Sequence, residues 1–261
     1  MIIRQNIYMN TLQREREVVI YLPDDYETSG RRYPVMYIND GQNAFFDDQA
    51  YLGKSWGFID HVRWNNEQVI MVAIPCNFEP GMREMEYGPW ETEKFVTIME
   101  TGKSEPNIGG EGKAYVDFLK DELKPFMDAN YPTDPEDTAI VGSSAGGNIS
   151  LYAALTYPET FGKCAALSCA IWYYPKQFQA LVREADLSKL KCLYLDVGSD
   201  EGNGNSSISN LYRYDNNVIY EMLMEKENNE CVHYAYYDGA RHSEEEWRKR
   251  VPAFMFFFYH G

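Results

Sequence analysis

The sequence TAIVGSSAGGNISLYAAL, residues 138–155, places a glycine–serine turn between two different apolar patterns. Residues 138–141 form a short apolar run typical of a buried strand, and residues 148–155 carry apolar side chains at helical spacing. The G-x-S-x-G pattern between them, Gly142 to Gly146, is typical of a nucleophile elbow, a sharp strand-to-helix turn that exposes a serine hydroxyl. Small residues are needed beside that serine because larger side chains would collide with the neighbouring backbone. We therefore predict that Ser144 is a nucleophile; the alternative is a glycine-rich turn that only packs.

Outward from this turn, apolar runs and helical patterns alternate along the chain. Several runs are apolar without alternation, as expected of strands that are covered on both faces. The first two should pair as an antiparallel edge, and the order of the others favours a mostly parallel sheet of about eight strands covered by helices on both faces. Strands are predicted at residues 6–9, 18–22, 35–38, 69–74, 138–141, 164–167, 192–195 and 232–236, and long helices at 114–130, 208–227 and 244–259.

Composition narrows the class of protein. No linker or repeat divides the 261 residues, so one α/β domain over 1–261 is expected. A net charge of −16 repels nucleic acid and anionic membranes. The first residues lack the apolar segment of a signal peptide, and no apolar run is long enough to span a bilayer. The five cysteines lie in apolar runs, which indicates free thiols. We expect a cytoplasmic protein with no cofactor and, since no metal-ligand spacing occurs, no metal; the oligomeric state stays open.

A serine hydroxyl needs a base to take its proton and a carboxylate to orient that base. His242 is the strongest of four candidate bases because it follows the last predicted strand and precedes Ser243 and Glu246, which match a helix capping box. His61 lies in a predicted helix, His233 lies inside a predicted strand, and His260 is one residue from the end.

The carboxylate is expected between Ser144 and His242, since α/β-hydrolases use the order serine, acid, histidine. Asp200 and Glu201, just past a strand, are both candidates; Asp196 is still inside that strand, and Asp238 is a fallback. The oxyanion hole needs two backbone N–H groups. We predict that Ala145 gives one and that Gln42, in the turn after residues 35–38, gives the other.

The segment PVMYINDGQNAFF, residues 34–46, resembles the "lyxxDGQNxF" segment of the esterase D-like branch of α/β-hydrolases, the putative esterase family. The match continues in order through residues 142–146, 158–163, 195–202 and 239–247, and spans roughly residues 15 to 260. This branch includes feruloyl and acetyl xylan esterases, enterobactin esterases and S-formylglutathione hydrolases. The chain departs from the last of these at residues 40–43, where they tend to carry a longer, different loop.

The resemblance implies the α/β-hydrolase fold, places the acid on Glu201 at the family's G-T-x-[DE] turn, and implies a serine esterase. We expect a small or carbohydrate-linked ester substrate, of acetyl or feruloyl type. The alternatives are acyl transfer on the same machinery, or a non-catalytic binding protein with this fold. The long connection at about residues 75–111 is expected to be a lid or a substrate wall. Within the loops, Trp90, Trp172 and Arg83 are the predicted substrate-binding residues.

Overall fold

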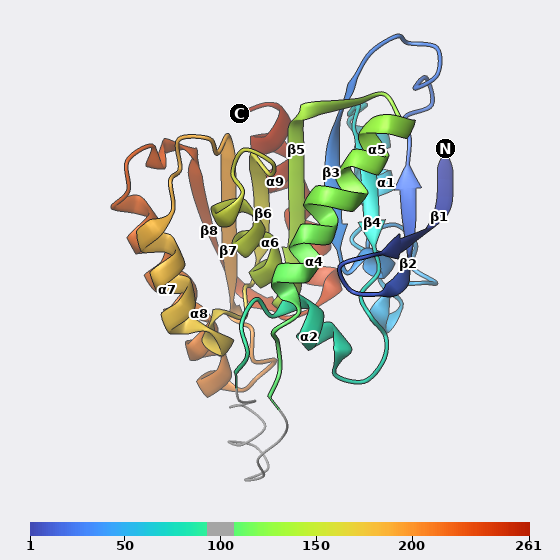
Figure 1. The fold of residues 1–261 in the computed structure, drawn as a ribbon. Helices are drawn as coiled ribbons and strands as arrows, with labels where there is room; N and C mark the ends of the chain where they lie inside the picture. The colour runs from blue at the N-terminus through green and yellow to red at the C-terminus, as the bar shows by residue number, and fades with distance from the viewer. Residues whose placement is uncertain (93–106) are drawn as a thin grey trace.

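The apolar runs form one sheet of eight strands in the computed structural model, which describes residues 1–92 and 107–261. The strand order is β1-β2-β4-β3-β5-β6-β7-β8; β1 and β2 pair antiparallel, β2 also pairs antiparallel with β4, and the remaining pairs are parallel (Figure 1). This confirms the predicted mostly parallel sheet with an antiparallel edge. The strands are β1 Ile2–Met9, β2 Arg14–Tyr21, β3 Tyr33–Asn39, β4 Ile70–Ile74, β5 Thr133–Ser143, β6 Lys163–Leu167, β7 Cys192–Asp200 and β8 Val232–Arg241.

Alternate residues of the central strands enter two separate cores, because successive side chains of a strand point to opposite faces. In β3, Val35 and Tyr37 belong to one core, whereas Met36 and Ile38 belong to the other. Both faces are therefore covered, which explains why these strands are apolar without alternation.

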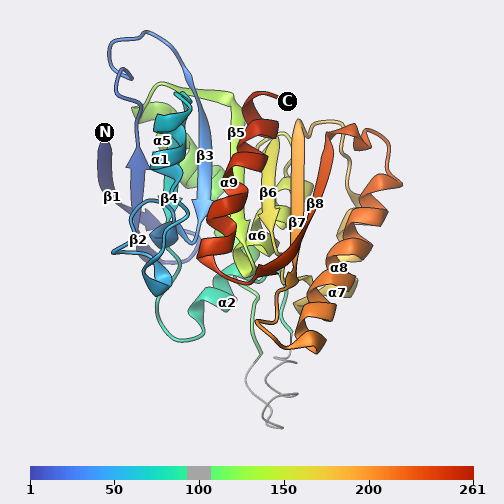
Figure 2. The ribbon, with the colours of Figure 1, turned by 180° about the vertical axis from the view of Figure 1, so that it is seen from behind.

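Helices α1 and α9 cover one face, and α4 to α8 cover the other (Figures 1 and 2). The predicted helix at 114–130 is α4 and α5 joined by a π-helical turn at Leu119–Leu123. The helices are α1 Phe58–Trp64, α2 Met82–Tyr87, α4 Gly112–Phe118, α5 Lys124–Asn130, α6 Ala145–Thr156, α7 Pro175–Glu184, α8 Ser206–Met224 and α9 Glu244–Tyr259.

The predicted capping box of α9 does not form. Ser243 is the residue that precedes the helix, but its side chain makes no capping hydrogen bond. Glu246 instead accepts a hydrogen bond of 2.6 Å from Lys249, one turn further along. Glu246 is half-buried, and its ion pair with Lys249 at this spacing competes with the capping contact.

The long connection between β4 and α4 is pinned to the sheet at its described ends. Thr92 and Ile108 exchange two backbone hydrogen bonds of 2.9 Å, which close the base of the connection. Glu86 of α2 is fully buried and pairs with Arg16 of β2. A buried carboxylate needs such a partner, so this pair fixes where α2 lies. The centre of the predicted lid, residues 93–106, lies outside the described residues.

Candidate active site

Four polar residues occupy equivalent places at one edge of the sheet. Asp40, Ser144, Glu201 and His242 are each the first residue after a strand, namely β3, β5, β7 and β8. These strands are parallel, so their carboxyl ends lie at the same edge. Ligand sites of open α/β sheets lie at that edge.

Ser144 has a backbone conformation that non-glycine residues rarely adopt, with φ 57° and ψ −124°. Such strain persists only where the surrounding structure enforces it, and it clusters at functional sites. The neighbouring glycines are required here. A Cβ on Gly142 would lie 2.1 Å from the carbonyl oxygen of Gly146, and a Cβ on Gly146 would lie 2.9 Å from Asp40 Oδ2. The predicted strand–turn–helix geometry is present.

His242 and Glu201 form a direct pair. His242 Nδ1 lies 2.7 Å from Glu201 Oε2, and the Glu201 side chain is fully buried. The imidazole packs between two aromatic rings, with centroid distances of 4.9 Å to Tyr212 and 4.8 Å to Trp247. The two ring contacts and the contact at Nδ1 hold the imidazole in one orientation, which leaves Nε2 as the ring nitrogen available to a substrate or a nucleophile.

Glu201 accepts further hydrogen bonds on its other oxygen. Ser168 Oγ donates to Glu201 Oε1 at 2.6 Å, and the Gly198 N–H donates at 2.5 Å. Burial alone would raise the pKa of Glu201, but the hydrogen bonds and charge of His242, with those of Ser168 and Gly198, outweigh it and lower the pKa. The carboxylate is therefore kept ionised beside the imidazole.

A buried cation, Arg250, lies near the Glu201 carboxylate, with its Nη2 at 3.8 Å from Glu201 Oε1. Arg250 of α9 is 1% exposed and donates to Ser168 Oγ and to Asp196 Oδ1, each at 2.8 Å. Burial raises the pKa of Asp196 to about 6, against the lowering effect of Arg250. Asp196 thus belongs to the buried network behind Glu201.

The other two candidate acids lie elsewhere. Asp200 accepts a hydrogen bond from the Gly204 N–H at 2.7 Å and pairs with Arg241 at 3.3 Å. Asp238 lies in the exposed part of β8. Of the three neighbouring candidates, Glu201 is the one in contact with His242.

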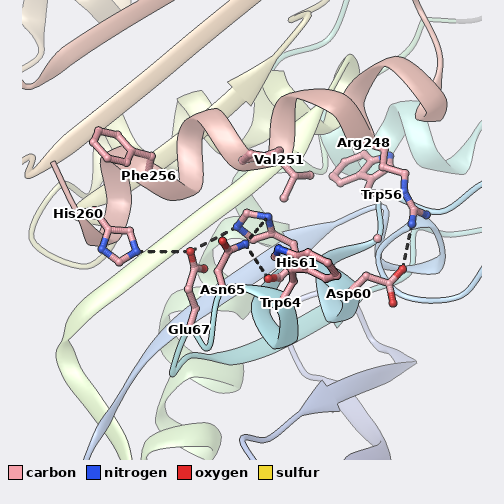
Figure 3. Close-up of a pocket in the computed structure, with 12 residues that line it drawn as sticks. Trp56, Asp60, His61, Trp64, Asn65, Glu67, Arg248, Val251, Phe256 and His260 are labelled. Atoms are coloured by element: carbon pink, nitrogen blue, oxygen red, sulfur yellow. Dashed lines mark hydrogen bonds and ion pairs between the residues drawn. The ribbon is translucent and has the colours of Figure 1, made fainter.

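Two of the remaining histidines lie in a different hollow, shown in Figure 3. This hollow has a volume of about 520 Å³ and lies between α1 and α9. His61 and His260 both face Glu67 there, at 3.4 and 3.6 Å. His233 stacks on Phe257 with a centroid distance of 3.9 Å. Of the four histidines, only His242 lines the hollow that contains Ser144.

The Ser144 pocket has a volume of about 510 Å³. It is formed by the loops after β3, β4, β5 and β8, by part of α2, and by the first turns of α9. Its lining residues are Asp40, Gln42, Asn43, Gln49, Ala50, Tyr51, Leu52, Cys76, Phe78, Arg83, Glu84, Ser143, Ser144, His242, Glu244 and Trp247.

The predicted oxyanion donors lie at the starts of two helical segments beside Ser144. Ala145 is the first residue of α6, and Gln42 is the second residue of a 3₁₀ turn at Gly41–Asn43. The first N–H groups of a helix have no acceptor within it. The Gln42 side chain is held in place by accepting a hydrogen bond of 3.1 Å from the Cys76 N–H.

Of the three predicted substrate-binding residues, one lines the Ser144 pocket and two do not. Arg83 lines the Ser144 pocket, where both of its terminal contacts go to Asp40 at 2.7 Å. Trp90 instead packs edge-on against Tyr152 and Phe178, at 5.4 and 5.2 Å, and is not a lining residue. Trp172 is not a lining residue either, since its ring stacks on Tyr173 at 3.8 Å and packs against Tyr212.

Tyr212 was not anticipated from the sequence. It lies on α8, is 5% exposed, and lies close to Ser144 and Trp172; burial raises its pKa. It is therefore a neutral hydroxyl beside the serine. One feature of the sequence could have indicated Tyr212. The helix that follows Glu201 has Tyr212, Asn216 and Ile219 at helical spacing, and these three residues share its buried face.

Within residues 1–92 and 107–261, no cluster of three or more metal-ligating side chains is suited to hold a metal ion. Likewise, none of the helices described has the length and apolar character to cross a membrane.

Known proteins resemble this chain in sequence and in fold. The alignment with the protein YbbA of Bacillus subtilis is 25% identical over 217 residues, and it covers 81% of this chain and 79% of YbbA. The alignment with the siderophore triacetylfusarinine C esterase of Aspergillus fumigatus is 25% identical over 151 residues, and it covers 58% of this chain and 48% of that esterase.

Two solved structures show the shared fold. An IroE-like serine hydrolase from Shewanella oneidensis aligns with a TM-score of 0.77 at 20% identity, covering 97% of this chain and 79% of that one. The enterobactin esterase FES from Shigella flexneri aligns with a TM-score of 0.69 at 17% identity, covering 99% of this chain and 59% of that one. The sheet described above is thus the central sheet of an α/β-hydrolase fold. The family model described as "Putative esterase" matches residues 9–257, and the chain therefore belongs to the putative esterase family.

Proposed function

We propose that the protein is a serine carboxylic-ester hydrolase that works through an acyl-enzyme. The observation that carries this is the 2.7 Å contact between Glu201 and His242 at the pocket where the strained Ser144 lies. In this mechanism Ser144 Oγ attacks the ester carbonyl while His242 Nε2 takes the serine proton. His242 then protonates the departing alcohol, and a water molecule, activated by the same nitrogen, releases the acid.

The surrounding groups have distinct parts in this mechanism. Glu201 orients His242 and stabilises the imidazolium that forms at each proton transfer. The Ala145 and Gln42 N–H groups bind the oxyanion of the tetrahedral intermediates. The proposed substrate is a small or carbohydrate-linked ester of acetyl or feruloyl type, and a pocket of about 510 Å³ has room for either acyl group. The two reported proteins that are named as esterases, from Shigella flexneri and Aspergillus fumigatus, support this reaction class.

The test of the reaction class uses p-nitrophenyl acetate with the purified chain. We expect a burst of p-nitrophenol equal to the concentration of active sites, followed by slower steady turnover, because acylation by a good leaving group outpaces deacylation. Product analysis with an added alcohol separates hydrolysis from acyl transfer, the alternative on the same machinery. Failure to release p-nitrophenol from acetyl, butyryl and feruloyl esters would count against hydrolysis of these acyl groups and for the non-catalytic alternative.

Replacing Glu201 by Gln should lower kcat by about 10²–10⁴-fold. The substitution keeps the volume of the side chain but removes the charge that stabilises the imidazolium, and it leaves an amide where His242, Ser168 and Gly198 all donate. Steady-state kinetics on p-nitrophenyl acetate would measure the change.

The matched control is the adjacent Asp200→Asn, which should change kcat less than about tenfold because Asp200 contacts Arg241 and Gly204. If Asp200→Asn were the more damaging of the two, Glu201 would not be the acid of the mechanism.

A further inference from the structure

The charges in the Ser144 pocket do not balance. Its described lining contains three carboxylates, Asp40, Glu84 and Glu244, and one permanent cation, Arg83. The Arg83 guanidinium makes two hydrogen bonds of 2.7 Å to Asp40, and its Cζ lies 5.3 Å from the centre of the Tyr87 ring. Asp40 and Arg83 therefore neutralise each other. Two carboxylates remain.

Neither of the remaining carboxylates pairs with a basic side chain in the part of the chain that the structure describes. Glu244 is 7% exposed, and the Asn43 amide donates to its Oε1 at 3.3 Å. Burial raises the pKa of Glu244 above its ordinary value. Glu84 is half-buried on α2, where it directly follows Arg83. A buried carboxylate without a cation is costly, and a cationic ligand would remove that cost.

Aromatic rings face the same space. Phe78 and Tyr51 line the pocket although they are 72% and 66% exposed, and Trp247 lines it from α9. Exposed aromatic rings beside carboxylates are a favourable environment for an ammonium group, because the cation is attracted both by the ring faces and by the negative charges. The net charge of −16 adds long-range attraction for cations and repulsion of anions.

We propose that the ester cleaved at Ser144 carries an ammonium-type cation, which binds against Glu84, Glu244 and the rings of Phe78 and Tyr51. This inference rests on the proposed esterase function and adds the charge class of its substrate. Anionic esters are correspondingly poor substrates.

Three thioacetates of nearly equal size test the proposal: acetylthiocholine, its uncharged isostere S-(3,3-dimethylbutyl) thioacetate, and the anionic S-acetyl-3-mercaptopropionate. Thiol release is followed with Ellman's reagent, and the Ser144→Ala variant gives the background. At low ionic strength we expect kcat/KM to be about tenfold higher for the cationic ester than for the isostere, and lowest for the anion. High salt should reduce both differences.

The ratio of kcat/KM for the cationic ester to that for the isostere isolates the charge effect from changes in folding or chemistry. Glu84→Gln and Glu244→Gln should each lower this ratio by about threefold, and the double variant should bring it close to one. The matched control is Glu245→Gln, which removes the same charge from the residue next to Glu244. Glu245 is exposed and faces Lys249 at 3.8 Å, so its loss should leave the ratio unchanged.

Equal hydrolysis of the cationic ester and its isostere by the wild-type protein would overturn this inference. An equal loss of the ratio in Glu245→Gln would also overturn it, since the preference would then come from overall charge. Hydrolysis that depends on Ser144 but shows no charge preference leaves the proposed function standing. Failure to hydrolyse any of the three thioesters, or hydrolysis that survives Ser144→Ala, overturns both.

Discussion

Ser144→Ala should abolish the acyl-enzyme and lower kcat on p-nitrophenyl acetate by about 10⁴–10⁶-fold. The alanine leaves the pocket, the His242–Glu201 pair and the oxyanion donors in place, so the residual rate is that of water attacking a bound ester. Removal of one hydroxyl at a position already held by tight backbone contacts should leave the thermal unfolding midpoint close to that of the wild type. Electrospray mass spectrometry after mixing with substrate should show the acetyl adduct on wild type and none on the variant.

The control for this experiment is Ser143→Ala at the neighbouring position. Ser143 is the last residue of β5 and is 2% exposed, and it also lines the pocket. Ser143 lacks the positive φ of Ser144. The elbow therefore exposes the hydroxyl of Ser144 at its apex, and not that of Ser143. We expect Ser143→Ala to keep kcat within about tenfold of wild type. An acyl adduct on Ser144→Ala would place the nucleophile at another residue.

The fold could be predicted from the sequence because its strands bury both faces. A continuous apolar run such as residues 70–74 is stable as a strand only when both of its faces are buried. The glycine–serine turn at residues 142–146 fixes how one strand passes into a helix. The antiparallel edge was also readable, since β1 alternates between exposed and half-buried residues.

The candidate site could be predicted only in part. Ser144 and His242 carry local signals, because each follows a strand and precedes a helix. Glu201 does not, since Asp200 is equally close to the end of β7 and only the contact across to β8 separates the two. The resemblance to the esterase family is what favours Glu201 at the sequence level.

Residues that support the site from helices were missed, and two predicted loop aromatics pack outside the pocket lining. Arg250 stands in the sequence RKR at residues 248–250 and reads as a surface charge, yet it shares a buried face with Trp247 and Phe254 at helical spacing. Trp90 and Trp172 lie in loops near the sheet edge, but each finds aromatic neighbours outside the pocket. Side-chain direction in an irregular loop has no period from which it could be predicted.

His242→Ala should be nearly as damaging as Ser144→Ala, with kcat lowered by about 10⁴–10⁶-fold, because serine and histidine act as one unit. Without the imidazole, Ser144 loses its proposed general base. The buried Glu201 loses the partner that lies 2.7 Å away, so the variant should also be less stable. Stopped-flow measurement of p-nitrophenol release would show the loss of the burst itself, which distinguishes slow acylation from slow deacylation.

The same measurement on the other histidines decides whether the effect belongs to His242 alone. His61 faces Glu67 in the hollow between α1 and α9, and His233 stacks on Phe257, so neither adjoins Ser144. His61→Ala and His233→Ala should therefore keep the burst amplitude and a kcat within about tenfold of wild type. A burst that survived in His242→Ala, or one that vanished in His233→Ala, would mean that the base lies elsewhere. Of the four histidines, His242 alone lines the Ser144 pocket and contacts Glu201, so the burst should depend on it and not on the other three.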